Sequence, residues 1–129
     1  MKKDWSISDS EWWIMKCLWK RPFITIKEIH AMLLETKGWN KNMVRSLIVR
    51  LLNKGVIGAN REKRYFRYYP TVSRHDCIHK EMNSFIDRVF DGCYAEVLVL
   101  VSSIISSKEL SEEEQGALMN LSEFCKVRN

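Results

Sequence analysis

The sequence of 129 residues lacks the features that define several classes of protein. Its longest apolar run, residues 97–101, is far too short to cross a membrane, and its first residues lack the apolar stretch of a signal peptide. Its five glycines leave little scope for a loop that cradles a ligand. We therefore expect a cytoplasmic protein with no membrane partner. The cysteines form no tight pairs and are predicted to be reduced thiols: Cys17, Cys77, Cys93 and Cys125.

Motifs of catalysis and of metal binding are also missing. There is no G-x-S-x-G, no H-E-x-x-H and no convincing pair of Cys and His for nucleophilic catalysis, so an enzyme is not expected. His75 and His79 share one face of a predicted helix, but Cys77 lies about 200° around that helix from His75. Because no C-x-x-C or C-x-C motif is present either, neither a metal nor another cofactor is predicted.

The composition is globular, and its charge is unevenly distributed. Hydrophobic residues make up 46% of the chain and charged residues 29%, which suits one domain or two small ones. Residues 1–72 hold 15 Lys and Arg against 6 Asp and Glu, a net charge of +9, whereas residues 73–129 hold 6 against 10, a net charge of −4. This indicates that only the first half meets a polyanion, although chance asymmetry between two solvated surfaces gives the same pattern.

Capping boxes of the form S/T-x-x-E mark three helix starts, at residues 8–11, 25–28 and 111–114. Residues 97–101 suit a buried strand as well as a buried helix, but their helical neighbours favour a helix. Helices are thus predicted over residues 9–20, 26–36, 41–54, 74–90 (capped by Ser73), 94–105 and 112–126, and a hairpin from strands 56–60 and 65–69 around the polar stretch 61–64.

Three short helices followed by a basic hairpin is the order of a winged helix-turn-helix. The predicted fold is therefore mostly α with a small β-hairpin. A winged helix-turn-helix domain is expected over residues 1–72 and a C-terminal helical dimerisation domain over residues 73–129.

Apolar side chains at helical spacing define the expected core of the first domain. In the first helix, Trp12, Met15 and Trp19 are expected to be buried, with Ile14 and Leu18 beside them. The next two helices are expected to contribute Ile26, Ile29 and Leu33, and then the stripe of Val44, Leu47, Ile48 and Leu51.

The opposite face of the third helix is the predicted reader of DNA, because an α-helix fits the major groove. Arg45 can bond both acceptors of a guanine edge, and Met43 can offer only apolar contact, such as to a thymine methyl. The same face carries Asn42, Ser46 and Val49. Expected phosphate contacts are Lys41, Arg50 and Lys54, and the hairpin tip is expected to straddle the backbone or enter a minor groove through Arg61, Lys63 and Arg64. A solvated helix face and an unpaired hairpin tip are the alternative.

An apolar surplus in the second half predicts self-association into a homodimer. Residues 97–105 and the last helix carry enough apolar side chains to leave an exposed patch on a single chain. The side chains predicted to lie in the dimer interface are Ile78, Met82, Phe85, Ile86, Val89, Leu98, Val101, Ile105, Leu118, Leu121 and Phe124.

Six segments resemble the penicillinase-repressor family of bacteria, the BlaI/MecI type: ISDSEW (7–12), CLW (17–19), GWNKNMVRSLIVRLLNKG (38–55), YYP (68–70), FIDRVFDG (85–92) and LSEEE (110–114). The resemblance implies a winged-helix DNA-binding domain and a helical dimerisation domain. It implies that two chains bind a palindromic operator in double-stranded DNA and repress the gene beside it. It also implies that Arg45 contacts a base.

Three departures from the family pattern affect what the resemblance implies. Met43 stands where relatives have a threonine contact, so the operator sequence of relatives need not carry over. The Asn-Phe bond at which resistance-linked members are cut is absent near residues 98–101, and the paired C-x-C motifs of copper-responsive members are missing. Neither of these inducing mechanisms is predicted.

Two alternative functions stay open at this point. The first is an adaptor whose winged helix binds a protein; the basic first half and the position of Arg45 argue against it. The second is a repressor with a redox or metal input through Cys77, Cys93 or Cys125.

Overall fold

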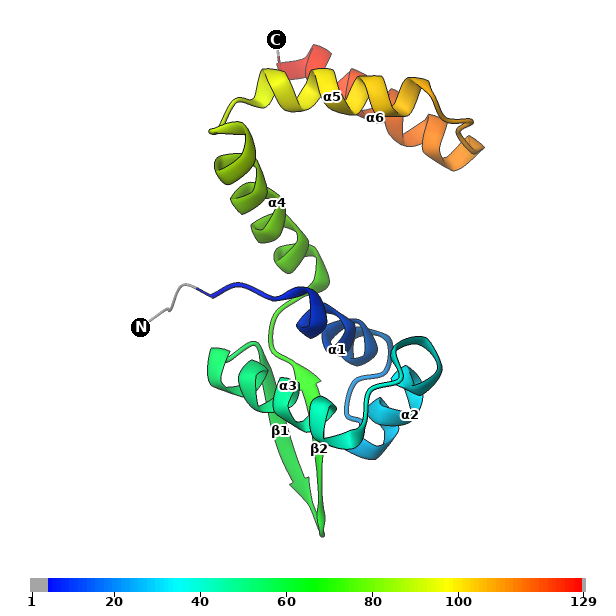
Figure 1. The fold of residues 1–129 in the computed structure, drawn as a ribbon. Coiled ribbons are helices and arrows are strands. Elements are labelled where there is room, and N and C mark those ends of the chain that lie inside the picture. Colours follow the sequence, from blue (N-terminus) through cyan, green and yellow to red (C-terminus); the bar gives the residue numbers. More distant parts are fainter. Residues whose placement is uncertain (1–4, 129) are drawn as a thin grey trace. The chain divides into compact units, whose positions relative to one another are not determined.

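The computed structural model describes residues 5–128, without the side chains of residues 122 and 124–128. In this part of the chain, helices and one antiparallel hairpin follow one another (Figure 1). The elements are α1 (Asp9–Lys20), α2 (Ile26–Lys37), α3 (Lys41–Lys54), β1 (Ile57–Glu62), β2 (Tyr65–Pro70), α4 (Arg74–Phe90), α5 (Tyr94–Ser106) and α6 (Glu112–Arg128). The chain divides into two compact units, Met1–Asn83 and Ser84–Asn129, so α4 runs from the first unit into the second.

These elements confirm the predicted fold class, mostly α with a small β-hairpin. Three helices extend slightly further than predicted, α2 to Lys37, α5 to Ser106 and α6 to Arg128. The alternative strand over residues 97–101 is wrong, because these residues lie inside α5. The assignment of two domains with a boundary after residue 72 stays a prediction.

All three predicted capping boxes form. Each N-cap hydroxyl accepts a hydrogen bond from the backbone N–H of its glutamate at 3.1–3.3 Å, and each carboxylate accepts one from the N-cap N–H at 2.8–2.9 Å. The pairs are Ser8–Glu11, Thr25–Glu28 and Ser111–Glu114. At the other end of α3, Gly55 adopts the left-handed conformation, with φ 77°, and stops the helix as predicted.

The core of the first unit follows the predicted periodicity in α3 and departs from it in α1. All four residues of the α3 stripe are buried, as are Ile29 and Leu33 of α2, whereas Ile26 is only half-buried. In α1 the fully buried apolar side chains are Ile14, Met15 and Leu18.

The expected burial of Trp12 and Trp19 is wrong in degree, because both are only partly buried at the edge of the core. Their ring centroids lie 5.8 Å apart. The indole N–H of Trp19 donates a hydrogen bond to the carbonyl of Val72 at 3.1 Å. A large ring with one polar group is well placed where that group finds an acceptor, and this position at the edge provides one. All five tryptophans of the chain belong to the first unit.

The hairpin is longer than predicted, with a shorter turn. Arg61 pairs with Phe66 and Glu62 with Tyr65, so two residues of the expected polar tip are strand residues. Only Lys63 and Arg64 form the turn, and Lys63 is in the left-handed region, with φ 57°. A two-residue turn with positive φ fits the right-handed twist of the strands that it joins. At the base of the hairpin, Ile24 forms an isolated bridge to Tyr68.

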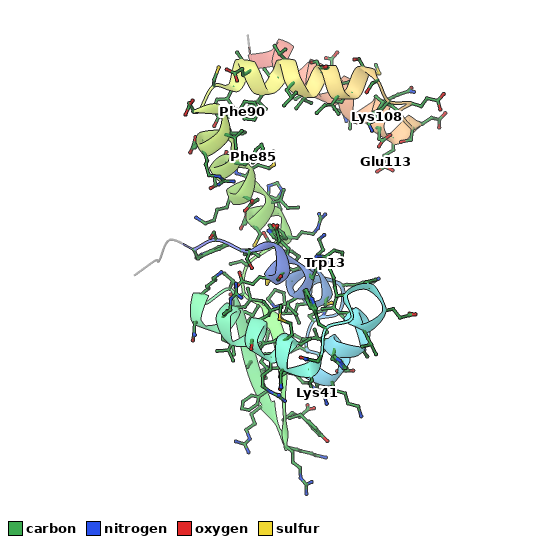
Figure 2. All side chains as sticks on the ribbon, in the orientation of Figure 1. Trp13, Lys41, Phe85, Phe90, Lys108 and Glu113 are labelled. Atoms are coloured by element: carbon green, nitrogen blue, oxygen red, sulfur yellow. The ribbon has the colours of Figure 1, made fainter. Side chains whose placement is uncertain are left out.

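In the second unit the apolar side chains of α5 are mostly exposed, and none of its residues is buried. Phe85 and Phe90 meet edge to face near the end of α4, with ring centroids 5.9 Å apart (Figure 2). Among the described residues no single helix has the length and apolar character to cross a membrane. By length and composition, that combination is met only when α4 and α5 are counted together across the bend between them.

Candidate nucleic-acid interface

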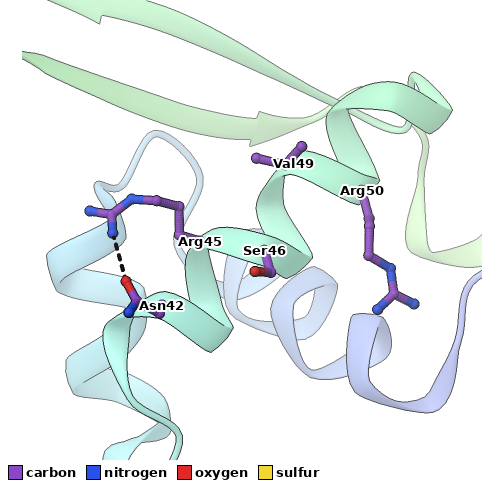
Figure 3. Close-up of a pocket in the computed structure, with 5 residues that line it drawn as sticks. All are labelled: Asn42, Arg45, Ser46, Val49 and Arg50. Carbon is purple, nitrogen blue, oxygen red and sulfur yellow. Dashed lines mark hydrogen bonds between the residues drawn. The ribbon is translucent and has the colours of Figure 1, made fainter.

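One face of α3 forms an open, shallow concavity of about 500 Å³. It is lined by Asn42, Arg45, Ser46, Val49 and Arg50 (Figure 3). All five are exposed, and all five are residues for which the sequence predicts contact with DNA. The buried stripe on the opposite face of α3 fixes this face toward solvent. Lys41 and Met43 are exposed at the start of the same helix.

Arg45 bonds to a residue of its own helix and acts electrostatically on the hairpin. Its guanidinium donates a hydrogen bond to Asn42 Oδ1 at 3.3 Å, one turn earlier on the helix. On β2, burial raises the pKa of Tyr68, and the positive charge of Arg45 nearby opposes that rise. Arg45 is itself exposed, so its remaining donors face solvent on this side of α3.

The far end of α3 is tied to α1 through a buried carboxylate. Glu11 is completely buried. Its Oε1 lies 2.5 Å from Lys54 Nζ, and its Oε2 lies 3.1 Å from Arg50 Nε. The contact with Arg50 is an ion pair without hydrogen-bond geometry. Burial alone would raise the pKa of Glu11, but hydrogen bonds from Lys54 and from the Ser8 backbone, with the nearby positive charges, lower it. The carboxylate is therefore ionised at neutral pH.

Sequence reasoning identified Glu11 as a capping residue and missed its role as a partner of the cations of α3. Arg50 and Lys54 were both predicted as phosphate contacts, and the structure brings them together on this one acid. The S-x-x-E pattern signalled the cap, and no local signal indicated the long-range ion pairs.

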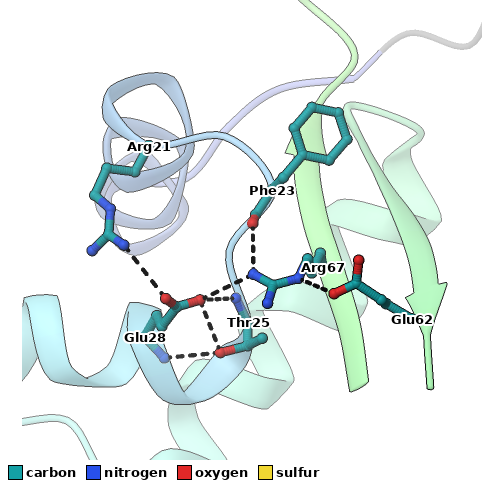
Figure 4. A network of polar contacts seen from close by, with 6 residues as sticks. All are labelled: Arg21, Phe23, Thr25, Glu28, Glu62 and Arg67. Atoms are coloured by element: carbon teal, nitrogen blue, oxygen red, sulfur yellow. Dashed lines mark hydrogen bonds and ion pairs between the residues drawn. The ribbon is translucent and has the colours of Figure 1, made fainter. Parts of the chain in front are cut away.

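The hairpin, or wing, is held against the body of the unit by a polar network around Arg67 (Figure 4). Arg67 Nε donates to Glu62 Oε1 at 2.8 Å, and its Nη1 donates to the carbonyl of Phe23 at 3.1 Å. The same Nη1 lies 3.7 Å from Glu28 Oε1, which brings the start of α2 into the network. Phe23 itself has a left-handed backbone, with φ 64°.

The outer part of the wing is basic and exposed, as predicted. Arg61, Lys63 and Arg64 are all exposed. The guanidinium of Arg61 lies 5.8 Å from the ring centroid of Phe66, its cross-strand partner. Nearer the base, Tyr68 is buried, and the ring of Tyr69 stacks on the ring of Phe23 with centroids 5.0 Å apart. The aromatic residues of β2 therefore include packing residues, while the three cations project from the end of the hairpin.

Comparison with known proteins accounts for nearly the whole chain. The family model described as penicillinase repressor matches residues 7–123. The chain belongs to this family. The penicillinase repressor of Bacillus licheniformis is 31% identical over 128 residues, which cover 99% of this chain and 98% of that protein. The methicillin resistance regulatory protein MecI of Staphylococcus aureus (strain N315) is 29% identical over 119 residues, which cover 92% of this chain and 94% of MecI.

Solved structures of a penicillinase repressor match more than half of the chain. The solution structure of the DNA-binding domain of the repressor BlaI is 34% identical, with a TM-score of 0.53 over 59% of this chain and 93% of that one. The Bacillus licheniformis BlaI monomer in complex with the blaP half-operator is also 34% identical, with a TM-score of 0.50 and the same coverage. Family membership confirms the predicted class of a DNA-binding transcriptional repressor rather than an enzyme.

In this member of the penicillinase repressor family, most residues predicted for the dimer interface are exposed. Met82, Phe85, Val89, Leu98, Val101, Leu118 and Leu121 are 39–61% exposed. Ile78 and Ile105 are half-buried, and Ile86 is already buried within the single chain. The side chain of Phe124 lies outside the described residues.

The cysteines whose side chains the structure describes differ in accessibility. Cys17, Cys77 and Cys93 are free thiols, of which Cys17 and Cys77 are buried and Cys93 is exposed. Burial raises the pKa of Cys77 to about 11. Cys125 lies outside the residues whose side chains are described. His75 and His79 lie near each other, with ring centroids 6.0 Å apart, and no group of three or more metal-ligating side chains occurs in the described part of the chain.

Proposed function

We propose that the protein represses transcription as a homodimer on a palindromic operator, with α3 in the major groove and the wing on the DNA backbone. The observation that carries this proposal is the exposed face of α3, on which Asn42, Arg45, Ser46 and Val49 line one concavity. A helix whose other face is fixed in a core presents its exposed groups in one orientation, and the buried stripe of α3 supplies that support.

Within this face each residue has a proposed role. Arg45 reads a guanine edge through two of its donor nitrogens, and Met43 and Val49 offer apolar contacts to thymine methyl groups. Asn42 and Ser46 add polar contacts beside Arg45. Lys41 and Arg50 on α3, with Arg61, Lys63 and Arg64 on the wing, contact phosphates and contribute affinity for any sequence. The complex of Bacillus licheniformis BlaI with the blaP half-operator supports the same use of the first unit here.

A second copy of the chain is the proposed partner of the second unit. On α5, Leu98, Val99, Leu100 and Val101 are 43–71% exposed, and neighbouring apolar side chains of this kind are typical of a buried subunit interface. Since α5 is a regular helix with no buried residue, we infer that a second chain covers its apolar surface.

Sedimentation equilibrium at micromolar concentration tests the dimer. The expected mass is twice the 15.3 kDa of one chain. Leu98→Asp should shift the protein toward the monomer, because a charge would be buried in the interface. The matched change Ser103→Asp adds a charge to the same helix about 140° around from Leu98 and should leave the dimer intact. A monomeric wild-type protein would contradict the proposal.

The experiment that tests the function is selection from a random DNA library, followed by sequencing, at two salt concentrations. A palindrome whose half-sites lie about one helical turn apart, or a multiple of it, is expected. Salt-sensitive binding without a motif would make the protein a generic DNA binder. No binding at either salt concentration would favour the adaptor. Because its proposed ligand is chromosomal DNA, we place the protein in the cytoplasm.

A further inference from the structure

Three glutamates of this chain occupy the same position in a capping box, and one of them differs from the other two. Glu28 and Glu114 are half-buried and exposed, respectively. Glu11, in contrast, is completely buried and contacts two cations of α3, the helix proposed to enter the major groove. Helix capping alone requires neither the burial nor the two ion pairs, so Glu11 has a role beyond the start of α1.

The two cations that contact Glu11 are held to different extents. Lys54 Nζ lies 2.5 Å from the carboxylate and 2.6 Å from the carbonyl of Ser6, and its side chain is 28% exposed. The side chain of Arg50 is 52% exposed. Its Nε lies 3.1 Å from Glu11 Oε2, and its Nη2 donates a hydrogen bond to Ser8 Oγ at 3.3 Å. Arg50 also lines the concavity on the exposed face of α3. The ammonium group of Lys54 is thus held by Glu11 and Ser6, whereas Arg50 contacts Glu11 and is also exposed on the surface of α3.

Burial makes this arrangement hard to rearrange when DNA binds. A phosphate that drew Lys54 away would leave a buried carboxylate without its closest partner, and an uncompensated buried charge is strongly destabilising. The charge of Arg50, by contrast, can stay near Glu11 while another part of its guanidinium meets a phosphate, because the group carries five donors.

We propose that Glu11 is a positioning residue for DNA binding, which fixes Arg50 beside a backbone phosphate and withdraws Lys54 from the DNA. This inference rests on the proposed function and deepens it. Apart from Arg45, the proposed reader of bases, it divides the basic residues of α3 into Lys41 and Arg50, which neutralise phosphates, and Lys54, which neutralises Glu11. It replaces the interpretation of Lys54 as a phosphate contact.

The salt dependence of binding separates these roles, because each neutralised phosphate adds about 0.9 to the slope of log affinity against log salt. A short duplex of random sequence is the probe, titrated between about 50 and 200 mM salt. Lys41→Gln and Lys54→Gln are a matched pair, since both remove one lysine from the same helix. Arg50→Gln, alone and combined with Glu11→Gln, completes the set, with Glu114→Gln as a control for capping alone.

Lys41→Gln and Arg50→Gln should each lower the magnitude of the slope by about 0.9, whereas Lys54→Gln should leave it unchanged. In the Arg50→Gln background, Glu11→Gln should raise the magnitude by about 0.9, because Lys54 is released to a phosphate while no positioned arginine is lost, and Glu114→Gln should change nothing. Urea unfolding provides a second readout: Lys54→Gln should lower stability without altering the slope.

The inference is overturned if Lys54→Gln lowers the slope as much as Lys41→Gln, or if Arg50→Gln leaves it unchanged. An unchanged slope when Glu11→Gln is added to Arg50→Gln in a folded protein also overturns it. If circular dichroism shows that this double variant does not fold, the comparison of the single variants Lys41→Gln, Arg50→Gln and Lys54→Gln tests the inference alone. A wild-type protein without salt-dependent DNA binding would overturn the proposed function as well, so the two failures are distinguishable.

Discussion

The guanidinium of Arg67, in the second strand of the wing, donates a hydrogen bond to the backbone carbonyl of Phe23, 3.1 Å away, in the connection between α1 and α2. This bond joins the wing to a segment whose backbone is itself unusual, since Phe23 has a φ of 64°. The ring of Phe23 stacks on Tyr69 in the same strand, at 5.0 Å. Backbone and side chain of Phe23 therefore both hold the base of the wing, and the basic turn extends from a fixed support.

Replacing the proposed reader should reduce sequence preference more than general affinity. Arg45→Ala is expected to cost about 1–3 kcal/mol of binding free energy at the selected operator and little on random DNA, because it removes base contacts. Fluorescence anisotropy with both duplexes measures the two losses. Arg88→Ala in the second unit removes an exposed arginine as a control. Equal losses on the two duplexes would make Arg45 a phosphate contact instead.

Neutralising the turn of the wing should act on every DNA sequence alike. Arg64 is exposed at the end of the hairpin, so Arg64→Gln is expected to weaken operator and random DNA by the same factor and to lower the salt slope by about 0.9. Titrations of both duplexes at several salt concentrations check this. Lys108→Gln, an exposed lysine of the second unit, should leave the slope unchanged. A loss confined to the operator would mean that the wing reads bases.

Two glycine substitutions should change stability in opposite directions. A Cβ at Gly58 would lie 2.5 Å from the ring of Tyr69, so Gly58→Ala must displace a ring that is stacked on Phe23 and should destabilise the first unit by about 1–3 kcal/mol. Nothing lies within 4 Å of a Cβ at Gly116 in α6, so Gly116→Ala should stabilise the second unit by up to about 1 kcal/mol. Urea unfolding measures both. A neutral Gly58→Ala would show that Tyr69 moves freely.

Thiol labelling should separate the cysteines by burial. In the native protein, iodoacetamide is expected to modify Cys93 rapidly and to leave Cys17 and Cys77 intact, because burial hides both thiols and raises their pKa, in Cys77 to about 11. Mass spectrometry of the digested protein identifies each site. Labelling in urea should remove the difference. Rapid modification of Cys77 without denaturant would contradict the packing of α4 on the first unit's core.

The stability of the first unit should depend on pH through Glu11. Its pKa is lowered in the folded chain, so the ionised carboxylate favours folding. This contribution is complete above the unfolded pKa of about 4.3 and is lost as the pH falls through the lower folded value. Urea unfolding over this range should therefore show a steeper loss of stability for the wild type than for Glu11→Gln. Parallel pH profiles for the two proteins would contradict the ion pairs.

Local signals in the sequence were sufficient to predict most of the fold. Capping boxes, Gly55 and the spacing of Val44, Leu47, Ile48 and Leu51 act within one or two helical turns, and the structure confirms each of them. The exposed face of α3 follows from the same spacing, since it is the face that the core stripe leaves free.

The parts that the sequence did not predict depend on contacts between distant segments. Glu11 and Lys54 are 43 positions apart, and nothing near either residue marks the other as its partner. The extent of the hairpin was underestimated because Arg61 and Glu62 are charged, yet a solvent-exposed edge strand tolerates charge. Trp19 was placed in the core by its spacing, while its indole N–H keeps it at the edge beside Val72.

The confinement of all five tryptophans to the first unit makes the protein's intrinsic fluorescence specific to one half of the chain. Tryptophan emission follows the unfolding of that half alone, whereas far-UV circular dichroism follows helices in both. Recorded on one sample, the two signals assign each step of denaturation to its own unit without any added label. A change of emission on adding DNA would likewise originate in the half that carries α3 and the wing.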